Sequence, residues 1–453
     1  MKTLLTFSAM ALMTWHAPVF ANDAPNQAIT EHKKSSVNLK IDSWHLDNGA
    51  KVLLVKRHAL PIVDINVSFD AGSRRDDADK IGVAEFAGAL MDMGAGKWSE
   101  EDIRRISSDW AVTVASYSET EQAGIRIRSL SKPSTLKQAL QLGQTILSKP
   151  TYPQEVLKRE QNRSILSLKQ SQTNPDFLAS QAQARLNYPQ HPYGYWAQEN
   201  EQSLSAITRE DLLAFHQRHF RPHTAVVSIV GDVSRTQANN IAKQLLQDLP
   251  QEKIDLPAIA AVAKPKATRQ HIQHPASQTQ ISLSMPVISR DDEDYFALLV
   301  GNYTLGAGGF DSLLMKRLRD ERGFTYGAYS NLSPMAQKGV FAIELSTQSA
   351  NAAEALQETE QVLRDYLKQG PTEEQLQQAK NNIIGGFPMR FDTNNKLLGW
   401  LSVIGFYDLP LDYLETYPQK VQALTTEDIR QAWQKRIQVE DLNVVTVGQS
   451  QKP

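Results

Sequence analysis

Three histidines form the densest set of metal-binding side chains in this chain of 453 residues, which contains no cysteine. They lie in the sequence HQRHFRPH as His216, His219 and His223. On a helix, His216 and His219 would share a face and could hold one ion. The same positions fall at the C-terminal end of a predicted helix, where imidazoles complement the helix dipole, and the sequence favours this structural role.

A glycine-rich stretch, LGAGGFDSLL at residues 305–314, opens a predicted helix and has the outline of a phosphate-binding loop. It lacks the Gly-Lys-Ser/Thr ending, and Asp311 replaces the third glycine of Gly-x-Gly-x-x-Gly. We therefore expect Gly306, Gly308 and Gly309 to form a loop that another backbone approaches closely, and not a nucleotide site.

The stretch RLRDERGFTYGAYS, residues 317–330, places two hydrogen-bond donors seven positions apart. Arg319 lies at the end of a predicted helix, and Tyr326 lies at the start of a predicted strand. Considered alone, the charges are those of a solvated helix end, and the tyrosines are typical of a sheet.

The stretch GVAEFAGALMDMGAG predicts a helix at residues 82–93. Its apolar stripe consists of Val83, Phe86, Ala87 and Leu90. The other face, predicted to point outward, carries Glu85, Gly88, Ala89 and Asp92. A glycine inside a helix costs about 1 kcal/mol relative to alanine, so a chemical or packing reason is needed for this nearly empty face.

These side chains must be positioned by a chain that contains an internal repeat. Residues 207–231 and 424–448 align without a gap, and each begins with an N-cap threonine, continues as an amphipathic helix and ends in a β-branched strand. A repeat of this length predicts two duplicated domains. The positions that match the three histidines are Trp433, Arg436 and Glu440.

Further patterns indicate an α+β fold. Predicted elements are a hairpin at 44–57, strands at 62–72, 111–118 and 122–130, and helices at 134–147 and 154–170. Hairpin-connected strands with helices in runs favour two duplicated domains, each a mostly antiparallel sheet packed with helices, over a doubly wound parallel sheet.

Composition narrows the class of protein. The net charge of -2 gives no electrostatic reason to expect nucleic acid, and the absence of cysteine excludes disulfides and thiolate metal sites. Lys2, an apolar run at 4–15 and the sequence Val19-Phe20-Ala21 predict a signal peptide that is cleaved near Ala21. The run is too short for a stable membrane anchor, so a periplasmic protein is expected.

Loss of periodicity in a Pro-, Ala- and Lys-rich stretch places the domain boundary. The predicted divisions are a signal peptide at 1–21, a flexible leader at 22–37, a first domain at 38–250, a linker at 251–275 and a second domain at 276–450.

Several motifs in order resemble the pitrilysin/insulinase family of zinc metallopeptidases and their mitochondrial processing relatives. They run from LDNGAKVLLV through HPYGYWAQENEQSL and SIVGDV to the closing VVTVG. The resemblance covers nearly all of the predicted mature chain. It implies paired α+β domains, of which two pairs close as a clamshell around an unfolded peptide.

In active members of that family, the helix that matches 82–93 carries His-x-x-Glu-His, which binds zinc and activates water. The matching positions here are Glu85, Gly88 and Ala89, and residues 166–168 are Leu-Ser-Leu where a third ligand would fall. Glu160 is too far upstream to replace that ligand. The resemblance thus implies no metal or cofactor on this chain, which alone is expected to be inactive.

The resemblance assigns a role to Arg319 and Tyr326, because a matching Arg/Tyr pair in the family holds the substrate carbonyl. The glycine-rich loop lies in front of this pair, so Gly306, Gly308 and Gly309 are expected to bind the substrate. Some bacterial members place the zinc motif and this pair on separate chains. We therefore expect this chain to pair as a heterodimer with a zinc-bearing homologous subunit and to bind a peptide or unfolded polypeptide. The peptide is expected to add to an edge strand, at 111–118 or its equivalent in the partner.

Two other functions are weighed. The chain could be a non-enzymatic peptide-binding or scaffold protein of the same fold, although retention of Arg319 and Tyr326 argues against full decay. It could also be an independent hydrolase built around HPYGYW at 191–196, but no nucleophile is identifiable there. Glu199 stands where many relatives have glycine, so local geometry near it is expected to differ.

Overall fold

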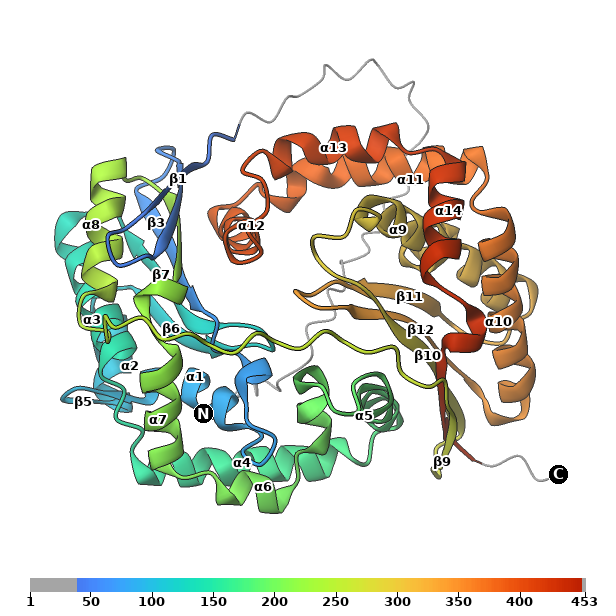
Figure 1. The fold of residues 1–453 in the computed structure, drawn as a ribbon, viewed down its shortest axis with the longest axis horizontal. Coiled ribbons are helices and arrows are strands. Elements are labelled where there is room, and N and C mark those ends of the chain that lie inside the picture. Colours follow the sequence, from blue (N-terminus) through green and yellow to red (C-terminus); the bar gives the residue numbers. More distant parts are fainter. Residues whose placement is uncertain (1–38, 450–453) are drawn as a thin grey trace, which may run out of the picture. The chain divides into compact units, whose positions relative to one another are not determined.

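Two open β-sheets and the helices that cover them make up residues 39–449, the part of the chain that the computed structural model describes (Figure 1). The predicted signal peptide and leader lie outside the described residues, as does residue 450. All described residues belong to one unit that begins at Leu39. The α+β fold class with two sheet domains is confirmed.

The first sheet is six-stranded and has the order β1-β2-β8-β3-β7-β6. Its strands are β1 Asp42–His45, β2 Lys51–Lys56, β3 Ile62–Phe69, β6 Thr113–Ser118, β7 Ala123–Leu130 and β8 Val226–Gly231. Only β2 and β8 pair in parallel; the other pairs are antiparallel. The predicted hairpin at 44–57 is confirmed as β1 and β2, and β6 forms one edge of the sheet.

The second sheet is five-stranded and has the order β11-β12-β10-β13-β9. Its strands are β9 Arg269–Gln273, β10 Gln278–Ile288, β11 Ala328–Ser333, β12 Gly339–Gln348 and β13 Asn443–Gly448. β9 pairs in parallel with β13 and lies inside the stretch 251–275 that lacks sequence periodicity. The two-residue strands β4 Gly94–Ala95 and β5 Trp98–Ser99 form a separate small ribbon.

Helices cover these sheets. The α-helices of the first half are α1 Val83–Ala89, α2 Glu100–Asp109, α3 Pro133–Ser148, α4 Gln154–Ser171, α5 Pro175–Asn187, α6 Glu201–Ala206, α7 Arg209–His219 and α8 Arg235–Leu246. Those of the second half are α9 Tyr295–Asn302, α10 Ala352–Gln369, α11 Glu373–Gly386, α12 Asn394–Phe406, α13 Tyr413–Ala423 and α14 Thr426–Arg436. The part of the chain that the structure describes also contains two π-helical segments, η5 Tyr303–Ala307 and η7 Met315–Glu321.

Short 3-10 turns connect many of these elements. They are η1 Ser73–Arg75, η2 Met91–Met93, η3 Pro192–Gln198, η4 Pro222–Thr224, η6 Gly309–Asp311, η8 Ser349–Asn351, η9 Phe387–Arg390 and η10 Val439–Asp441.

The internal repeat is also a repeat of structure. The order α7, η4, β8 recurs as α14, η10, β13, with equal lengths and spacings. Thr208 and Asp211 form a capping box at α7, and Thr425 and Asp428 form the same box at α14. In each box, the threonine hydroxyl and the aspartate carboxylate satisfy backbone N–H groups that the first helical turn leaves unpaired. The repeated helix–strand unit is therefore confirmed.

Each sheet is covered in part by a helix from the opposite half of the chain. α5, from the first half, packs on β10 and β13, and α12, from the second half, packs on β2, β3 and β8 (Figure 1). On α12, a Cβ at Gly405 would clash with the side chains of Val226 and Leu53, so glycine lets the helix lie directly on the sheet. Neither sheet is therefore fully covered by its own half.

A buried polar network fixes α5 to the second sheet. The Gln183 Nε2 donates to the carbonyl oxygens of Ser282, at 2.7 Å, and Asn443, at 3.1 Å, and its Oε1 accepts from the Ser284 hydroxyl at 2.6 Å. One turn later, Asn187 donates to Ser284 at 2.7 Å and accepts from Asn443 at 2.9 Å. Such a network specifies one register of the helix on the sheet, because a shifted helix would leave buried groups unpaired.

A buried carboxylate joins further segments of the two halves. Glu121, in the β6–β7 turn, forms an ion pair with Arg74 and accepts hydroxyl hydrogen bonds from Tyr193 and Tyr407, each at 2.6 Å. The backbone N–H of Ala336, between β11 and β12, donates to the same carboxylate at 3.1 Å. These partners compensate the cost of burying the charge.

Replacing Gln183 with leucine tests the network under α5. The substitution keeps an apolar body but removes the donor to two carbonyl oxygens and the acceptor of the Ser284 hydroxyl, which retains its hydrogen bond from Asn187. Urea denaturation should show a free energy of unfolding lower by about 2 kcal/mol. The same change at an exposed glutamine on α10, Gln357→Leu, is the control and should alter it by less than about 0.5 kcal/mol. Equal effects of the two substitutions would contradict the structural role given to Gln183.

Candidate functional site

Helix α1 is shorter than the sequence predicts. It ends at Ala89, and η2 at Met91–Met93 follows as a separate turn, so the prediction of one helix over 82–93 is wrong at its C-terminal end. The chain turns again after η2, where Gly94 has a φ of 154°, and the Asp92 carboxylate accepts the backbone N–H of Ser116 on β6 at 3.1 Å. Asp92 therefore belongs to a contact with the sheet.

The predicted empty outward face of α1 is also wrong, because that face is packed against β6 and β7. Gly88 is buried, and a Cβ placed there would lie 2.9 Å from the Cβ atoms of Ser118 and Ala123. The Ser118 hydroxyl donates to the Ala84 carbonyl oxygen at 3.2 Å, and the Ser116 hydroxyl donates to that of Ala89 at 2.9 Å. The small residues of this face therefore serve close packing.

This geometry does not fit a zinc site at α1. Of the three positions that match His-x-x-Glu-His, only Glu85 has a side chain that could bind a metal ion. At Gly88 there is no room even for the Cβ of a larger side chain. Glu160 forms ion pairs with Arg159, at 2.7 Å, and with Arg163, at 3.5 Å. Within residues 39–449, no three histidine or acidic side chains are arranged to hold a metal ion.

A group of three carboxyls surrounds the N-terminal end of α1. Asp76 accepts the backbone N–H groups of Gly82, at 2.9 Å, and Ala84, at 2.7 Å, yet burial raises its pKa to about 7. Burial also raises the pKa of Glu85 and of Glu199, and the charges of Glu85 and Asp76 raise the pKa of Glu199 further. The raised pKa values favour the protonated carboxyls over the anionic form that binds a metal ion.

The histidines have structural roles, as the sequence favours. The His216 Nε2 lies 2.8 Å from the Leu147 carbonyl oxygen, and its ring stacks on Phe220. Burial lowers the pKa of His216 and of His219 to about 4, so both are neutral at pH 7. The reason given from sequence, a charged imidazole complementing the helix dipole, is therefore wrong, because desolvation keeps these rings uncharged.

The HPYGYW segment is structural too. His191 Nε2 lies 2.9 Å from the carbonyl oxygen of Ala260, and its Nδ1 accepts the backbone N–H of Tyr193 at 3.2 Å. The Tyr193 hydroxyl donates to Glu121. Both ring nitrogens of His191 are thus engaged in holding η3 and the segment around Ala260, which leaves no base for the independent-hydrolase alternative.

The glycine-rich stretch at 305–314 begins inside the π-helical segment η5, which contains Gly306, and ends just before the π-helical segment η7. A Cβ at Gly306 would clash with the backbone nitrogen of Ser330 on β11, so the expected close approach of another backbone is confirmed there. Gly309 has a φ of 70° and has open space around it. Because π-helices are rare and are frequent at functional sites, this loop is a candidate site that periodicity in the sequence does not reveal.

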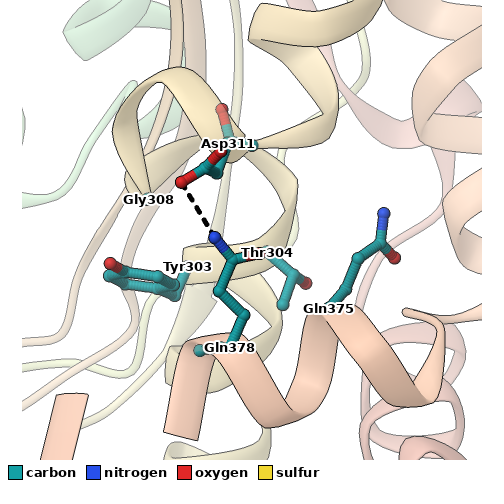
Figure 2. A pocket seen from close by; sticks show the side chains of 8 residues that line it. Tyr303, Thr304, Gly308, Asp311, Gln375 and Gln378 are labelled. Atoms are coloured by element: carbon teal, nitrogen blue, oxygen red, sulfur yellow. Dashed lines mark hydrogen bonds between the residues drawn. The ribbon is translucent and has the colours of Figure 1, made fainter. Parts of the chain in front are cut away.

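Beside this loop is a small cavity of about 10 Å³, large enough for one water molecule (Figure 2). Gly308 lines it together with Tyr303, Asp311 and Gln378. The Gln378 Nε2, on α11, donates to the Asp311 Oδ2 at 2.8 Å, as the dashed line in Figure 2 marks. The cavity is too small for a peptide. The hydrogen bond between Gln378 and Asp311 anchors the loop to α11. A substrate contact by Gly306, Gly308 or Gly309 stays a prediction.

Arg319 and Tyr326 line one larger cavity of about 330 Å³, within the range of ligand pockets. Arg319 is on η7 and its side chain is 39% exposed; Tyr326 follows η7 and is 90% exposed. The rest of the lining is mostly amide and hydroxyl side chains, namely Gln278, Thr325, Ser346, Thr347, Gln348 and Asn351, with Gly323 and Phe324. The structure thus brings the two sequence-predicted donors to one polar hollow.

Comparison with known proteins identifies the family. A family model described as Insulinase (Peptidase family M16) matches residues 51–193, and one described as Peptidase M16 inactive domain matches residues 206–383. A crystal structure of a peptidase M16 inactive domain from Pseudomonas fluorescens is 35% identical, with a TM-score of 0.88, and the match covers 92% of this chain and all of that one. The chain belongs to peptidase family M16.

Other relatives point the same way. The "Non-peptidase homolog YmxG" of Helicobacter pylori is 23% identical over 412 residues, which cover 89% of this chain and 94% of that protein. The periplasmic protease PqqL of Escherichia coli shares the fold, with a TM-score of 0.76 and 20% identity, and the match covers 94% of this chain but 47% of PqqL. The family models and names support a non-catalytic M16 chain.

Two glycines in helices test the packing of α1. Gly88→Ala adds a methyl group that meets Ser118 and Ala123 at 2.9 Å, so it should lower the free energy of unfolding by about 1–3 kcal/mol. Gly399→Ala, on α12, adds a methyl group with nothing within 4 Å. It should raise the same quantity by about 0.5–1 kcal/mol, the ordinary gain of alanine over glycine in a helix. Stabilisation by both substitutions in thermal denaturation would show that α1 has room for a side chain.

The side-chain carboxyl of Glu199 predicts that the stability of the folded chain depends on pH. Burial raises the pKa of Glu199 in the folded state, so the folded chain binds this proton more tightly than the unfolded chain does. The resulting contribution to the free energy of unfolding is fully present below the pKa of the unfolded state and is lost as the pH rises through the pKa of the folded state. Glu199→Gln, a neutral isostere, should therefore become more stable relative to the unmodified chain as pH rises from 5 to 8, by about 1.4 kcal/mol for each unit of pKa shift. The exposed Glu101→Gln on α2 should follow the unmodified chain. A constant difference between Glu199→Gln and the unmodified chain would contradict a protonated Glu199.

Proposed function

We propose that this chain is the non-zinc subunit of a periplasmic heterodimeric metallopeptidase, in which a homologous partner with His-x-x-Glu-His supplies the zinc. The subunit binds a peptide or unfolded polypeptide and orients it for cleavage. Support comes from three features: the misfit of zinc at α1, membership in the M16 family, and the placement of Arg319 and Tyr326 on one polar cavity.

The single observation that carries the proposal is the exposure of Tyr326. Its side chain is 90% exposed although it lies on the short segment between η7 and β11, both of which have buried residues, and it lines the same cavity as the half-exposed Arg319. Tyrosines of a folded domain usually bury their rings, and an exposed tyrosine with a free hydroxyl is typical of a surface that a partner or ligand completes.

Arg319 and Tyr326 act on the substrate as hydrogen-bond donors. The guanidinium and the phenol hydroxyl donate to the carbonyl oxygen of the peptide bond to be cleaved, and they remain bonded to it as negative charge develops on that oxygen. Two such donors lower the barrier by several kcal/mol once water is excluded, typically about 3 kcal/mol each. The zinc of the partner supplies the activated water, for which residues 39–449 of this chain offer no group of metal ligands.

The edge of the first sheet limits where the peptide binds. Ser116 is on the edge strand β6, and its backbone N–H already donates to Asp92 at 3.1 Å. That group is not available to an added strand, so a peptide that adds to this edge cannot accept a hydrogen bond from the Ser116 N–H, or it adds to the equivalent edge of the partner.

Export to the periplasm rests on the signal peptide at 1–21 and is consistent with the fold shared with PqqL. Among residues 39–449, none of the helices is both long and apolar enough to cross a membrane.

Reconstitution with a zinc-bearing homologue tests the proposed role. Mixed with that protein, this chain should permit cleavage of unfolded fluorescein-labelled casein that stops when zinc is chelated. Tyr326→Phe removes one donor and should lower kcat/KM by about 10²- to 10³-fold. Tyr329→Phe, which changes another exposed tyrosine nearby on β11, should leave kcat/KM unchanged.

The outcomes separate the two functions. Cleavage that needs this chain but is indifferent to Tyr326→Phe removes the role given to the tyrosine. Binding of labelled casein by this chain, without cleavage by any zinc-bearing homologue, supports the non-enzymatic peptide-binding or scaffold alternative.

A further inference from the structure

Phe310 is a large apolar side chain that the fold leaves 54% exposed at the tip of the glycine-rich loop. Burying a phenylalanine side chain removes apolar surface from water and stabilises a protein, and this chain forgoes about half of that gain here. The loop does not place Phe310 in either sheet's core. The position of its ring is therefore set by contacts with residues outside the core.

The loop holds Phe310 in a defined position. Ser312 donates to the Gly309 carbonyl oxygen through both its backbone N–H, at 3.1 Å, and its hydroxyl, at 2.7 Å. Asp311, the next residue after Phe310, accepts from Gln378 on α11 at 2.8 Å. The left-handed conformation of Gly309, with a φ of 70°, turns the chain immediately before Phe310. Phe310 is thus exposed on an anchored loop.

The ring of Phe310 contacts the guanidinium of Arg319. The Arg319 Cζ lies over the ring, 4.7 Å from its centroid, within the range of an attractive cation–π contact. The guanidinium also pairs with the carboxylate of the adjacent Asp320, at 3.3 Å, a long ion pair between exposed groups. The ring of Phe310 and the carboxylate of Asp320 are thus two contacts of the guanidinium, and of these the ring is held by the anchored loop.

We propose that Phe310 is a positioning residue for Arg319: its ring holds the guanidinium at the wall of the cavity that Tyr326 also lines. This inference rests on the function proposed for Arg319 and Tyr326. An arginine side chain has many rotamers, and a guanidinium that is already supported on a flat ring loses less freedom when it bonds a carbonyl oxygen. α11 anchors the loop through Gln378 and Asp311, the loop holds Phe310, and the ring of Phe310 supports the guanidinium of Arg319.

The contact itself can be tested on the isolated chain, without a partner or a substrate. Ring currents of Phe310 should shift the NMR signals of the Arg319 side-chain protons, which are assigned by their loss in Arg319→Lys. Phe310→Leu should abolish the shift, and Phe310→Trp should retain it. Leu166→Ala, at another exposed apolar side chain on α4, should leave these signals in place. Unchanged Arg319 signals in Phe310→Leu would overturn the inference.

Cleavage by the reconstituted pair tests the positioning role. Phe310→Leu should lower kcat/KM by about two- to fivefold, the effect of an exposed cation–π contact, and Phe310→Trp should restore it. In an Arg319→Lys background, the same substitution should have no further effect, because a positioning residue acts only through the group it positions. Equal losses in both backgrounds would mean that Phe310 acts on its own, and no loss in either would mean that it does not position Arg319; both results overturn the inference.

Failure of the inference can be told apart from failure of the proposed function. If Arg319→Lys does not change cleavage while Phe310→Leu moves the Arg319 signals, the ring contact is real but the function proposed for Arg319 is wrong, and the positioning role falls with it. If Arg319→Lys lowers kcat/KM while Phe310→Leu changes neither the signals nor cleavage, only the inference about Phe310 is wrong.

Discussion

The buried carboxylate of Glu121 is the interaction on which the two halves of this fold depend. It receives hydrogen bonds or an ion pair from Arg74, Tyr193, Tyr407 and Ala336, which lie on four separate segments. Without these donors the charge could not be buried, and without the carboxylate the hydroxyls and the guanidinium would be unpaired. Together with α5 and α12, each packed on the sheet of the opposite half, this network makes residues 39–449 one unit. η7, which carries Arg319, and the segment after it, which carries Tyr326, therefore belong to a framework to which both halves contribute.

In this family member, close packing of α1 against β6 and β7 occupies the place where metal ligands would lie. Gly88 brings α1 against Ser118 and Ala123, so the space of a ligand side chain is filled by β6 and β7. Around the same helix, Asp76, Glu85 and Glu199 are buried so that their pKa values are raised, which favours neutral carboxyls over anionic ligands. On the second sheet, by contrast, the cavity with Arg319 and Tyr326 is open and polar. Within one chain, the surroundings of α1 are thus closely packed, whereas Arg319 and Tyr326 line a cavity.

Much of the fold could be predicted from the sequence because it rests on local signals. The Thr208 and Thr425 capping boxes and the β-branched strands that follow them identify the repeated units, and the structure confirms them. The site could be predicted only in part. Arg319 and Tyr326 stand out by their spacing, but the π-helices around the glycine-rich loop and the carboxyl group near Glu199 depend on contacts between distant segments. For the same reason the sequence misplaced Gly88 on an open face: a glycine is equally consistent with solvent and with close packing.

The central claim is that this chain binds no zinc itself and directs a peptide to zinc held by another chain. Zinc analysis of the chain, purified under native conditions together with the proteins that remain bound to it, tests this most directly. The account predicts about one zinc ion per pair in fractions that contain a second, homologous chain, and none in fractions of this chain alone. A stoichiometric zinc ion in the chain alone would contradict it.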